Sequence, residues 1–167
     1  MAVTYDLIAS TSLSAATTTI SGISGAYKDL IIVMKSQLAA GSEEQRLRFN
    51  GDTGTNYKNG RVGSRWDGTG GTMWFNQTDN LTAIISQGTQ TTGYPQTWFI
   101  HVYDYANTNR VKAFNIVSVS NRSDSNGVGN VERIIGTYNS TAAITSVSFI
   151  TFGTPDSKSI GSIYGIG

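Results

Sequence analysis

The chain has 167 residues, a formal net charge of +1, one histidine and no cysteine. The near-neutral charge excludes a broad electrostatic surface for nucleic acid or an anionic membrane, and the missing cysteines exclude disulfides and thiolate metal sites. We expect a single domain over residues 1–167, in which residues 1–20 form either its first strands or an N-terminal arm.

The first half of the chain predicts short strands separated by turns. Tyr5–Ala9 is expected to be a strand with Tyr5, Leu7 and Ala9 on one face, and Thr18–Ile20 a weak edge strand. Tyr27–Leu38 is the longest apolar, β-branched run, which is typical of a central strand. Gln45–Asn50 alternates between apolar and charged residues and ends in Asn50-Gly51, a type I′ turn signal.

The central run carries apolar side chains on both faces of the predicted strand. Leu30, Ile32, Met34 and Leu38 share one face, and Ile31 and Val33 share the other. Both faces therefore need cover. The sequence shows no amphipathic helix, so the cover is expected to be a second sheet, a subunit partner, or both.

Two segments after this run are less regular. Ser42-Glu43-Glu44-Gln45 matches a helix capping box, but only about two turns would fit before Asn50-Gly51, so we expect loop and strand here. A second turn dipeptide follows at Asn59-Gly60. Gly60–Thr78 is rich in glycine and is expected to be a long surface excursion or a decorated hairpin.

Thr97–Tyr105 predicts a strong strand with two different faces. Trp98, Ile100 and Val102 form an ordinary core face. The other face is aromatic with polar tips, which suits a subunit contact. Its residues are Phe99, His101, Tyr103 and Tyr105.

The remaining segments complete an all-β pattern. Val111–Val119 is expected to pair with the preceding strand as a hairpin, and three more strands follow at Val131–Tyr138, Ile144–Phe152 and Lys158–Ile166. Roughly ten short strands at this spacing predict a two-sheet antiparallel sandwich of jelly-roll type.

No residue pattern in the chain indicates catalysis, a metal site or a cofactor. Asn50–Asn56 places oxygen side chains at alternate positions, but the twelfth position of a calcium loop would be Arg61, so an Asx turn is favoured. His101 is expected to be a half-buried strand residue whose ring nitrogens are satisfied by neighbours. We therefore expect a protein that is not an enzyme.

Aromatic and basic residues outside the core suggest weaker alternatives. Trp66, Trp74 and Tyr94 are either ligand contacts that stack on sugar rings, or satellite core and subunit contacts. A basic cluster beside Trp66 is expected to be a solvated loop or a charge pair with a neighbouring protein, rather than a nucleic-acid site. Its members are Lys58, Arg61 and Arg65.

Four short blocks resemble a group of small bacteriophage virion proteins. They are Tyr5-Asp6-Leu7-Ile8-Ala9-Ser10, Tyr27-Lys28-Asp29-Leu30, Leu47-Arg48-Phe49-Asn50-Gly51-Asp52-Thr53-Gly54-Thr55-Asn56-Tyr57 and Ile163-Tyr164-Gly165-Ile166. The resemblance runs through the chain in order, although only the block from Arg48 to Tyr57 is distinctive. It implies a β-rich structural component of the phage particle and supplies no catalytic residues.

From this resemblance we expect a capsid decoration (cement) protein on the virion surface. Such a protein would bind major capsid subunits, stabilise the shell and form a homotrimer at three-fold positions. A phage tail-associated protein, or a carbohydrate-binding β-sandwich module with a glycan partner, is the alternative. Neither nucleic acid nor a membrane is expected as a partner.

Overall fold

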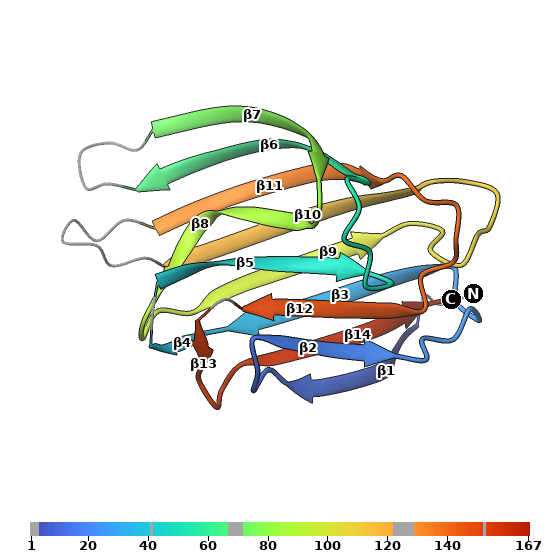
Figure 1. Cartoon of the computed structure of the whole chain (residues 1–167), viewed down its shortest axis with the longest axis horizontal. Coiled ribbons are helices and arrows are strands. Elements are labelled where there is room, and N and C mark those ends of the chain that lie inside the picture. The colour runs from blue at the N-terminus through green and yellow to red at the C-terminus, as the bar shows by residue number, and fades with distance from the viewer. Residues whose placement is uncertain (1–3, 41, 67–71, 122–128, 152) are drawn as a thin grey trace.

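The computed structural model describes residues 4–40, 42–66, 72–121, 129–151 and 153–167, and all regular elements in these ranges are strands (Figure 1). The expected all-β class is confirmed. The strands form an eight-stranded sheet, a four-stranded sheet and a two-stranded ribbon, and each ladder is antiparallel. We call the first two the large sheet and the small sheet.

The large sheet contains, in spatial order, β1 (Tyr5–Ser12), β14 (Ile160–Ile166), β3 (Asp29–Ser36), β9 (Gln96–Val102), β10 (Lys112–Asn121), β11 (Gly129–Tyr138), β6 (Tyr57–Trp66) and β7 (Thr72–Leu81). The small sheet contains β2 (Thr17–Ser21), β12 (Ser146–Thr151), β5 (Ser42–Phe49) and β8 (Ile84–Thr91). The ribbon pairs β4 (Leu38–Ala40) with β13 (Thr154–Pro155). The small sheet lies in front of the large one in Figure 1, so the two form a sandwich.

Residues Asp29–Ser36 of the central apolar run form β3 in the interior of the large sheet, with β14 and β9 on either side. The expected central strand is confirmed over these residues, whereas Leu38, which was expected in the same strand, belongs to β4 of the ribbon. Leu30, Ile32 and Met34 point toward the small sheet and are fully buried. Their burial removes three large apolar side chains from water, which stabilises the fold by roughly 1.5 to 3 kcal/mol for each side chain. Ile31 and Val33 point the other way, away from the small sheet.

The layer between the sheets is the hydrophobic core. Trp98, Ile100 and Phe114 reach it from the large sheet, and Leu47 and Phe49 from the small sheet, all with no exposed surface. The expected inward faces of β5 and β9 are therefore confirmed. Because Arg46 and Arg48 alternate with the inward residues of β5, the charged side chains fall on the opposite face of that strand.

Three local expectations are resolved by the strand pairings. The segment Ser42–Phe49 is a strand, which agrees with the expectation of loop and strand rather than helix. Strands β6 and β7 pair as a hairpin at the edge of the large sheet, which matches one of the two alternatives for this segment. Thr18–Ile20 lies within edge strand β2.

Two expectations were wrong in detail. Asn59-Gly60 is not a turn, because both residues pair with β11 on one side and β7 on the other inside strand β6. Ala9 does not share a face with Leu7, because a β-bulge between these two residues shifts the register of β1 against β14. Ala9 packs against the core instead.

Within the described residues, no helix has the length and hydropathy needed to cross a membrane.

Candidate interaction surface

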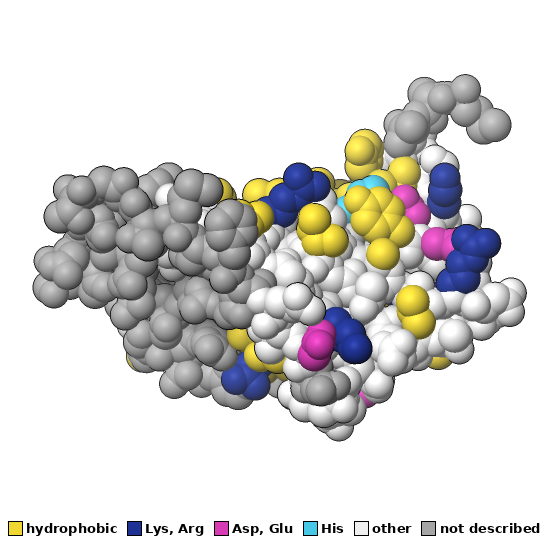
Figure 2. Space-filling view, turned by 90° about the horizontal axis from the view of Figure 1, so that it is seen from above, with side chains coloured by type: hydrophobic (Ala, Val, Ile, Leu, Met, Phe, Trp, Pro, Cys, Tyr) yellow, Lys and Arg dark blue, Asp and Glu magenta, His cyan; other side chains and the backbone are white. Residues whose placement is uncertain are grey.

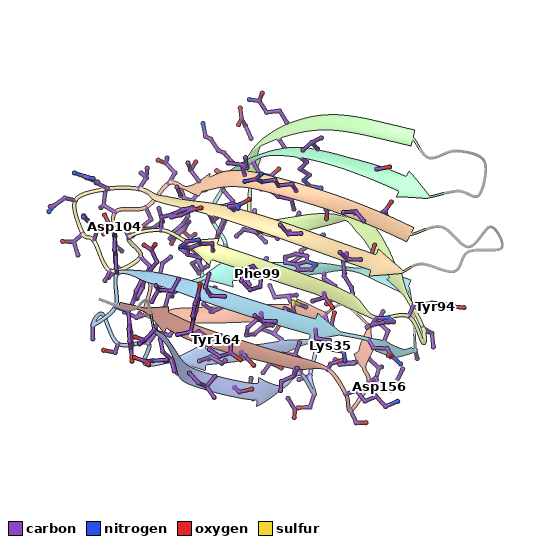
Figure 3. All side chains as sticks on the ribbon, turned by 180° about the vertical axis from the view of Figure 1, so that it is seen from behind. Lys35, Tyr94, Phe99, Asp104, Asp156 and Tyr164 are labelled. Carbon is purple, nitrogen blue, oxygen red and sulfur yellow. The ribbon has the colours of Figure 1, made fainter. Side chains whose placement is uncertain are left out.

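One side of the large sheet faces the small sheet, and no described element covers the other side (Figure 3). We call this uncovered side the open face. It carries exposed large hydrophobic side chains from five strands and from the residue just after β9. They are Tyr5 and Leu7 of β1, Ile160 of β14, Phe99 of β9, Val117 and Val119 of β10, Ile135 of β11, and Tyr103. Among the described residues, Val111 is the one other exposed large hydrophobic residue.

The strand registers place these residues side by side. Val33 of β3 lies opposite Phe99 of β9, and Phe99 lies opposite Val117 of β10. Directly opposite residues on neighbouring antiparallel strands have their side chains about 5 Å apart on the same face. The apolar surface is therefore continuous over β3, β9 and β10, and the same row continues to Ser162 of β14 on one side and to Arg133 of β11 on the other.

A shallow groove runs along one part of the open face. Its volume is about 330 Å³, and its lining is almost entirely apolar. The lining residues are Tyr5, Ile31, Val33, Phe99 and Tyr164. Both outward-facing residues of the central β3 run thus form the floor of a surface feature that no described element of the chain fills.

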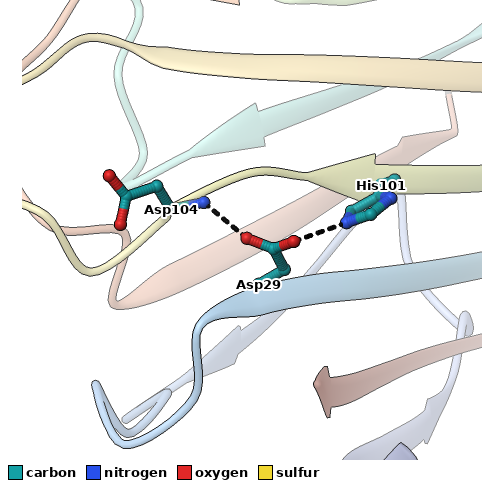
Figure 4. A network of polar contacts seen from close by, with 3 residues as sticks. All are labelled: Asp29, His101 and Asp104. Carbon is teal, nitrogen blue, oxygen red and sulfur yellow. Dashed lines mark hydrogen bonds and ion pairs between the residues drawn. The ribbon is translucent and has the colours of Figure 1, made fainter. Parts of the chain in front are cut away.

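The open face ends in a polar junction at the C-terminal end of β9 (Figure 4). The Asp29 carboxylate lies 2.9 Å from Nε2 of His101, and its second oxygen accepts the Asp104 backbone N–H at 2.8 Å. The rings of His101 and Tyr103 are 4.0 Å apart. His101 is therefore satisfied by a neighbour, in agreement with the expectation for this residue. In Figure 2, hydrophobic side chains adjoin this histidine at the upper margin of the molecule.

Three of the four residues expected to form a subunit contact lie on or beside the open face, and the fourth does not. Phe99, His101 and Tyr103 are at least partly exposed there. Tyr105 is fully buried in the core, and its hydroxyl donates a hydrogen bond to the Ser24 carbonyl. Assigning Tyr105 to this face was wrong. Asp104 has a φ of 52°, so strand alternation stops before Tyr105.

Trp66, Trp74 and Tyr94 are not assembled into one site by any described contact. Trp66 lies opposite Gly129 at the end of β6, and Trp74 lies opposite Gly63 in β7, but both side chains lie outside the described atoms. Tyr94 is half-buried in the connection between β8 and β9, and its ring points away from the sheet margin in Figure 3. Strands β9, β10 and β11 separate Tyr94 from β6.

The basic cluster expected beside Trp66 is divided between the two faces of β6. Lys58 is exposed on the open face, whereas Arg61 is buried and donates a hydrogen bond to the Asn59 side chain. Successive strand residues alternate in direction, so an odd spacing puts these two cations on opposite faces. The Arg65 side chain lies outside the described atoms. Lys58 and Arg61 therefore do not form one cationic patch.

The Asn50–Tyr57 segment is an internal clasp rather than an ion-binding loop. Asn50 and Gly51 have φ values of 54° and 63°, and the Asp52 N–H donates to the Phe49 carbonyl at 3.0 Å, which makes the expected tight turn. The Asp52 carboxylate accepts the Gly54 N–H at 2.7 Å, which is an Asx turn. The expected Asx turn is confirmed.

The clasp ties the two sheets together. The Asn50 side-chain oxygen accepts the Thr145 N–H at 2.8 Å, and its amide donates to the Ala143 carbonyl at 2.9 Å. The Tyr138 hydroxyl donates to Asp52 at 2.9 Å, and the Tyr57 hydroxyl accepts the Phe49 N–H at 3.0 Å. The Tyr138 and Tyr57 bonds join the end of β5 in the small sheet to β11 and β6 in the large sheet, whereas the Asn50 bonds join it to the connection between β11 and β12.

The clasp also sets two pKa values. Burial raises the pKa of Asp52, but hydrogen bonds from Asn56, the Gly54 N–H and Tyr138, together with the Arg48 charge, outweigh it and lower the pKa below the ordinary value. Burial, followed by the hydrogen bond to Asp52, raises the pKa of Tyr138 to about 12. Asp52 therefore stays ionised and Tyr138 stays protonated at neutral pH.

A buried lysine holds the loop beside the polar junction. Lys112 is fully buried, and its ammonium group donates to the carbonyls of Asn107 at 2.5 Å, Arg110 at 2.7 Å and Thr141 at 3.1 Å. Burial lowers the pKa of this amine. Three carbonyl acceptors satisfy all three ammonium protons, so this cation has a structural role in fixing the loop.

Sequence reasoning missed most of the open face. Val117, Val119 and Ile135 were predicted to lie in strands, but it was not predicted that they point outward. Tyr5 and Leu7 were predicted to share a strand face, but the strand next to theirs was not identified. One signal was present in β10, where two of the outward positions are Val117 and Val119 instead of polar residues. An exposed strand face normally alternates to polar residues, so two valines at such positions depart from the usual pattern.

In the described part of the chain, no three His, Cys, Asp or Glu side chains lie close enough to hold a metal ion. None of the protein-family models, curated proteins or solved structures with which the chain was compared matches it.

Proposed function

We propose that this chain is a bacteriophage virion structural protein, a capsid decoration protein that binds major capsid subunits and stabilises the shell. The observation that carries the proposal is the open face. A sheet with large apolar side chains on its uncovered side is completed by another protein, which suits a component of an assembly. The jelly-roll topology expected from the sequence remains a prediction within this proposal. The homotrimer expected from the sequence is also still a prediction, and the molar mass in solution decides between it and the two-fold pair described below.

The block that carries the resemblance supports a mechanical role. In Leu47–Tyr57, the polar side chains of Asn50, Asp52 and Tyr57 are engaged in bonds inside the chain. They hold the two sheets together and leave no converging acid, base or nucleophile at the surface of this block. A cross-linked sandwich of this kind resists mechanical load, which a shell under pressure from packaged DNA requires.

The test is binding to phage heads. Expanded heads of the phage that encodes the chain, prepared without this protein, are mixed with fluorescently labelled chain and sedimented. We expect saturable co-sedimentation at a fixed ratio of chain to major capsid subunits. Heads that already carry the protein are the control and are expected to bind none, because their sites are filled. Decorated heads should also survive heating to a higher temperature before releasing DNA.

Other outcomes assign the chain elsewhere. Co-sedimentation with isolated tails but not with heads would contradict the capsid role and support the tail-associated alternative. Binding to neither particle, with retention on immobilised glycans, would support the carbohydrate-binding alternative. In that case Tyr94→Ala should reduce glycan retention without lowering the thermal stability, since Tyr94 is a half-exposed residue in a connection.

A further inference from the structure

We propose that the open face binds a second copy of this chain, with the two large sheets packed face to face about a two-fold axis. This goes beyond the proposed function, because it assigns the open face to a second copy and leaves the contact with capsid subunits to another surface of the pair. The pairing depends only on the face itself, so it stands or falls separately from the virion role.

The alternating positions of the central strand β3 are apolar on both faces, and the small sheet covers only the face with Leu30, Ile32 and Met34. Ile31 and Val33 lie in the floor of the groove on the other face. Side chains of the large sheet itself leave Ile31 4% exposed and Val33 half-buried. A strand that is apolar on both faces is typical of a sheet that is covered by protein on both sides. Two copies joined through their open faces place β3 of each copy in such a sheet.

The exposed apolar area of the open face supports the pairing. The exposed fractions are 62% for Tyr5, 59% for Leu7, 57% for Ile135 and 48% for Phe99. With Tyr103, Val117 and Val119, these side chains expose on the order of 600 Å², because each aromatic residue alone offers about 150 to 250 Å². A stable interface of standard size buries about 800 Å² on each partner. The apolar residues therefore supply most of the required area, and the surrounding rim supplies the rest.

The charges along β3 favour a copy of the same chain, although the exposed Arg133 of β11, opposite Val117, also lies on the open face. Along the open face of β3, the outward residues run from Asp29 through Ile31 and Val33 to Lys35, with an acid at one end and a base at the other. Figure 3 shows Asp104 near the end of β3 that begins with Asp29, Phe99 near the middle of the sheet, and Lys35 toward the opposite end of β3. The rim near Lys35 also holds Asp156 and Lys158, whose opposite charges offset each other.

A two-fold axis in the plane of the interface, perpendicular to the strands, reverses the strand direction between copies. This axis places Asp29 of each copy opposite Lys35 of the other copy, so the interface contains two such contacts. Six residues of strand separate these positions, or about 20 Å, so the two contacts flank the apolar centre. An isologous interface needs such self-complementarity. Facing sheets also pack at about 10 Å, which these large side chains can fill.

The test measures the molar mass in solution by light scattering and by sedimentation over a concentration series. We expect a species of twice the 17.9 kDa chain mass. Val117→Lys places a second cation within the proposed contact, directly opposite the exposed Arg133 of β11. It should raise the dissociation constant about 100-fold or more, because it buries an ammonium group beside a like charge. Thr17→Lys is the matched control, an exposed strand residue of the small sheet, and should leave the pair intact.

A second variant tests the orientation. Lys35→Glu replaces each facing pair of opposite charges by two acids, so it should weaken the pair, and higher salt should restore part of the affinity. Circular dichroism should show both variants folded, because Val117 and Lys35 are exposed. If Lys35→Glu leaves the affinity unchanged at low salt, the two-fold orientation is wrong.

The masses also separate this inference from the proposed function. A monomer at all accessible concentrations, or the homotrimer expected from the sequence, would overturn the two-fold pairing. A monomer that still co-sediments with phage heads would remove the pairing and leave the capsid role. A pair that does not bind phage heads would support the two-fold pairing and contradict the capsid role.

Discussion

The two ends of the layer between the sheets differ in chemistry. At the end that holds the clasp, Phe49, Tyr57, Phe114 and Tyr138 fill the space, with ring centroids 4.9 to 6.4 Å apart. At the opposite end the inward positions of the same strands are polar and buried. They are Gln96 of β9, Ser118 and Ser120 of β10, Asn130 and Glu132 of β11, and Arg61 of β6. One set of strands therefore builds two kinds of interior.

This difference in chemistry indicates which end of the interior contributes more to the free energy of unfolding. The aromatic end combines ring contacts with the hydrogen bonds of Asp52 and Tyr138. At the polar end, the side-chain oxygens of Gln96 and Ser120 have no hydrogen-bond partner among the described residues. A buried polar group without a partner costs about 1 to 3 kcal/mol. We therefore expect the free energy of unfolding to depend mainly on the aromatic end.

The largest effect is expected for Phe114→Ala. This ring is fully buried, lies against Phe49 and covers the backbone at Gly136. Truncation leaves a cavity and should lower the free energy of unfolding by about 3 to 5 kcal/mol, measured by urea denaturation. Gln96→Ala, an equally buried truncation at the polar end, should cost less. Equal losses would contradict the comparison, and Phe114→Leu replaces Phe114→Ala if the latter does not fold.

A smaller effect is expected for Asn50, which joins the clasp to the small sheet. Asn50→Gly removes the side-chain bonds to Ala143, Thr145 and Ser146 while keeping a backbone that tolerates the φ of 54°. It should cost about 1 to 3 kcal/mol. Asn50→Ala adds left-handed strain of about 1 kcal/mol. If both variants unfold at the wild-type urea concentration, the clasp does not stabilise the sandwich.

The third prediction concerns pH. The pKa of Asp52 is lowered in the folded chain, so its stabilising contribution is present above the unfolded pKa of about 3.8 and is lost as the pH falls through the folded pKa. Tyr138 has the opposite sign. Its contribution is full below pH 10 and is lost as the pH rises toward about 12.

Asp52→Asn tests this window. The variant should lose about 1 to 2 kcal/mol at pH 7, because a charged acceptor of three hydrogen bonds is replaced. Its thermal midpoint should also fall less between pH 6 and pH 3 than that of the unchanged chain. The same steepness in both proteins would mean that other carboxylates cause the acid loss.

The sequence predicted the strands better than their surroundings. Alternation in β3, β5 and β9 identified the inward residues correctly, because period-two patterns are local. Local pattern did not reveal that strands β5 and β6, on either side of Asn50-Gly51, belong to different sheets. The same turn residues serve a hairpin and a crossing between sheets, and only long-range pairing decides between them.

The candidate surface was predictable only in part, for a similar reason. Phe99, His101 and Tyr103 were identified as an outward aromatic face. Extending the alternation to Tyr105 failed because the left-handed Asp104 could not be identified from its residue type alone. The open face as a whole requires strand order, since it brings together β1, β14, β3, β9, β10 and β11 from both ends of the chain.

The smallest effect is expected at Ser120, and it tests the polar end directly. Its hydroxyl is buried without a hydrogen-bond partner, so Ser120→Ala should leave the free energy of unfolding unchanged or raise it by up to about 1 kcal/mol. Ser159→Ala is the matched control, because the equally buried Ser159 hydroxyl bonds the N–H and the carbonyl of Gln37, each at 2.9 Å. It should lower stability by about 1 to 3 kcal/mol. A loss at Ser120 as large as that at Ser159 would show that the polar end is as fully hydrogen-bonded as the rest of the interior, and the contrast between the two ends would then be one of residue type rather than of stability.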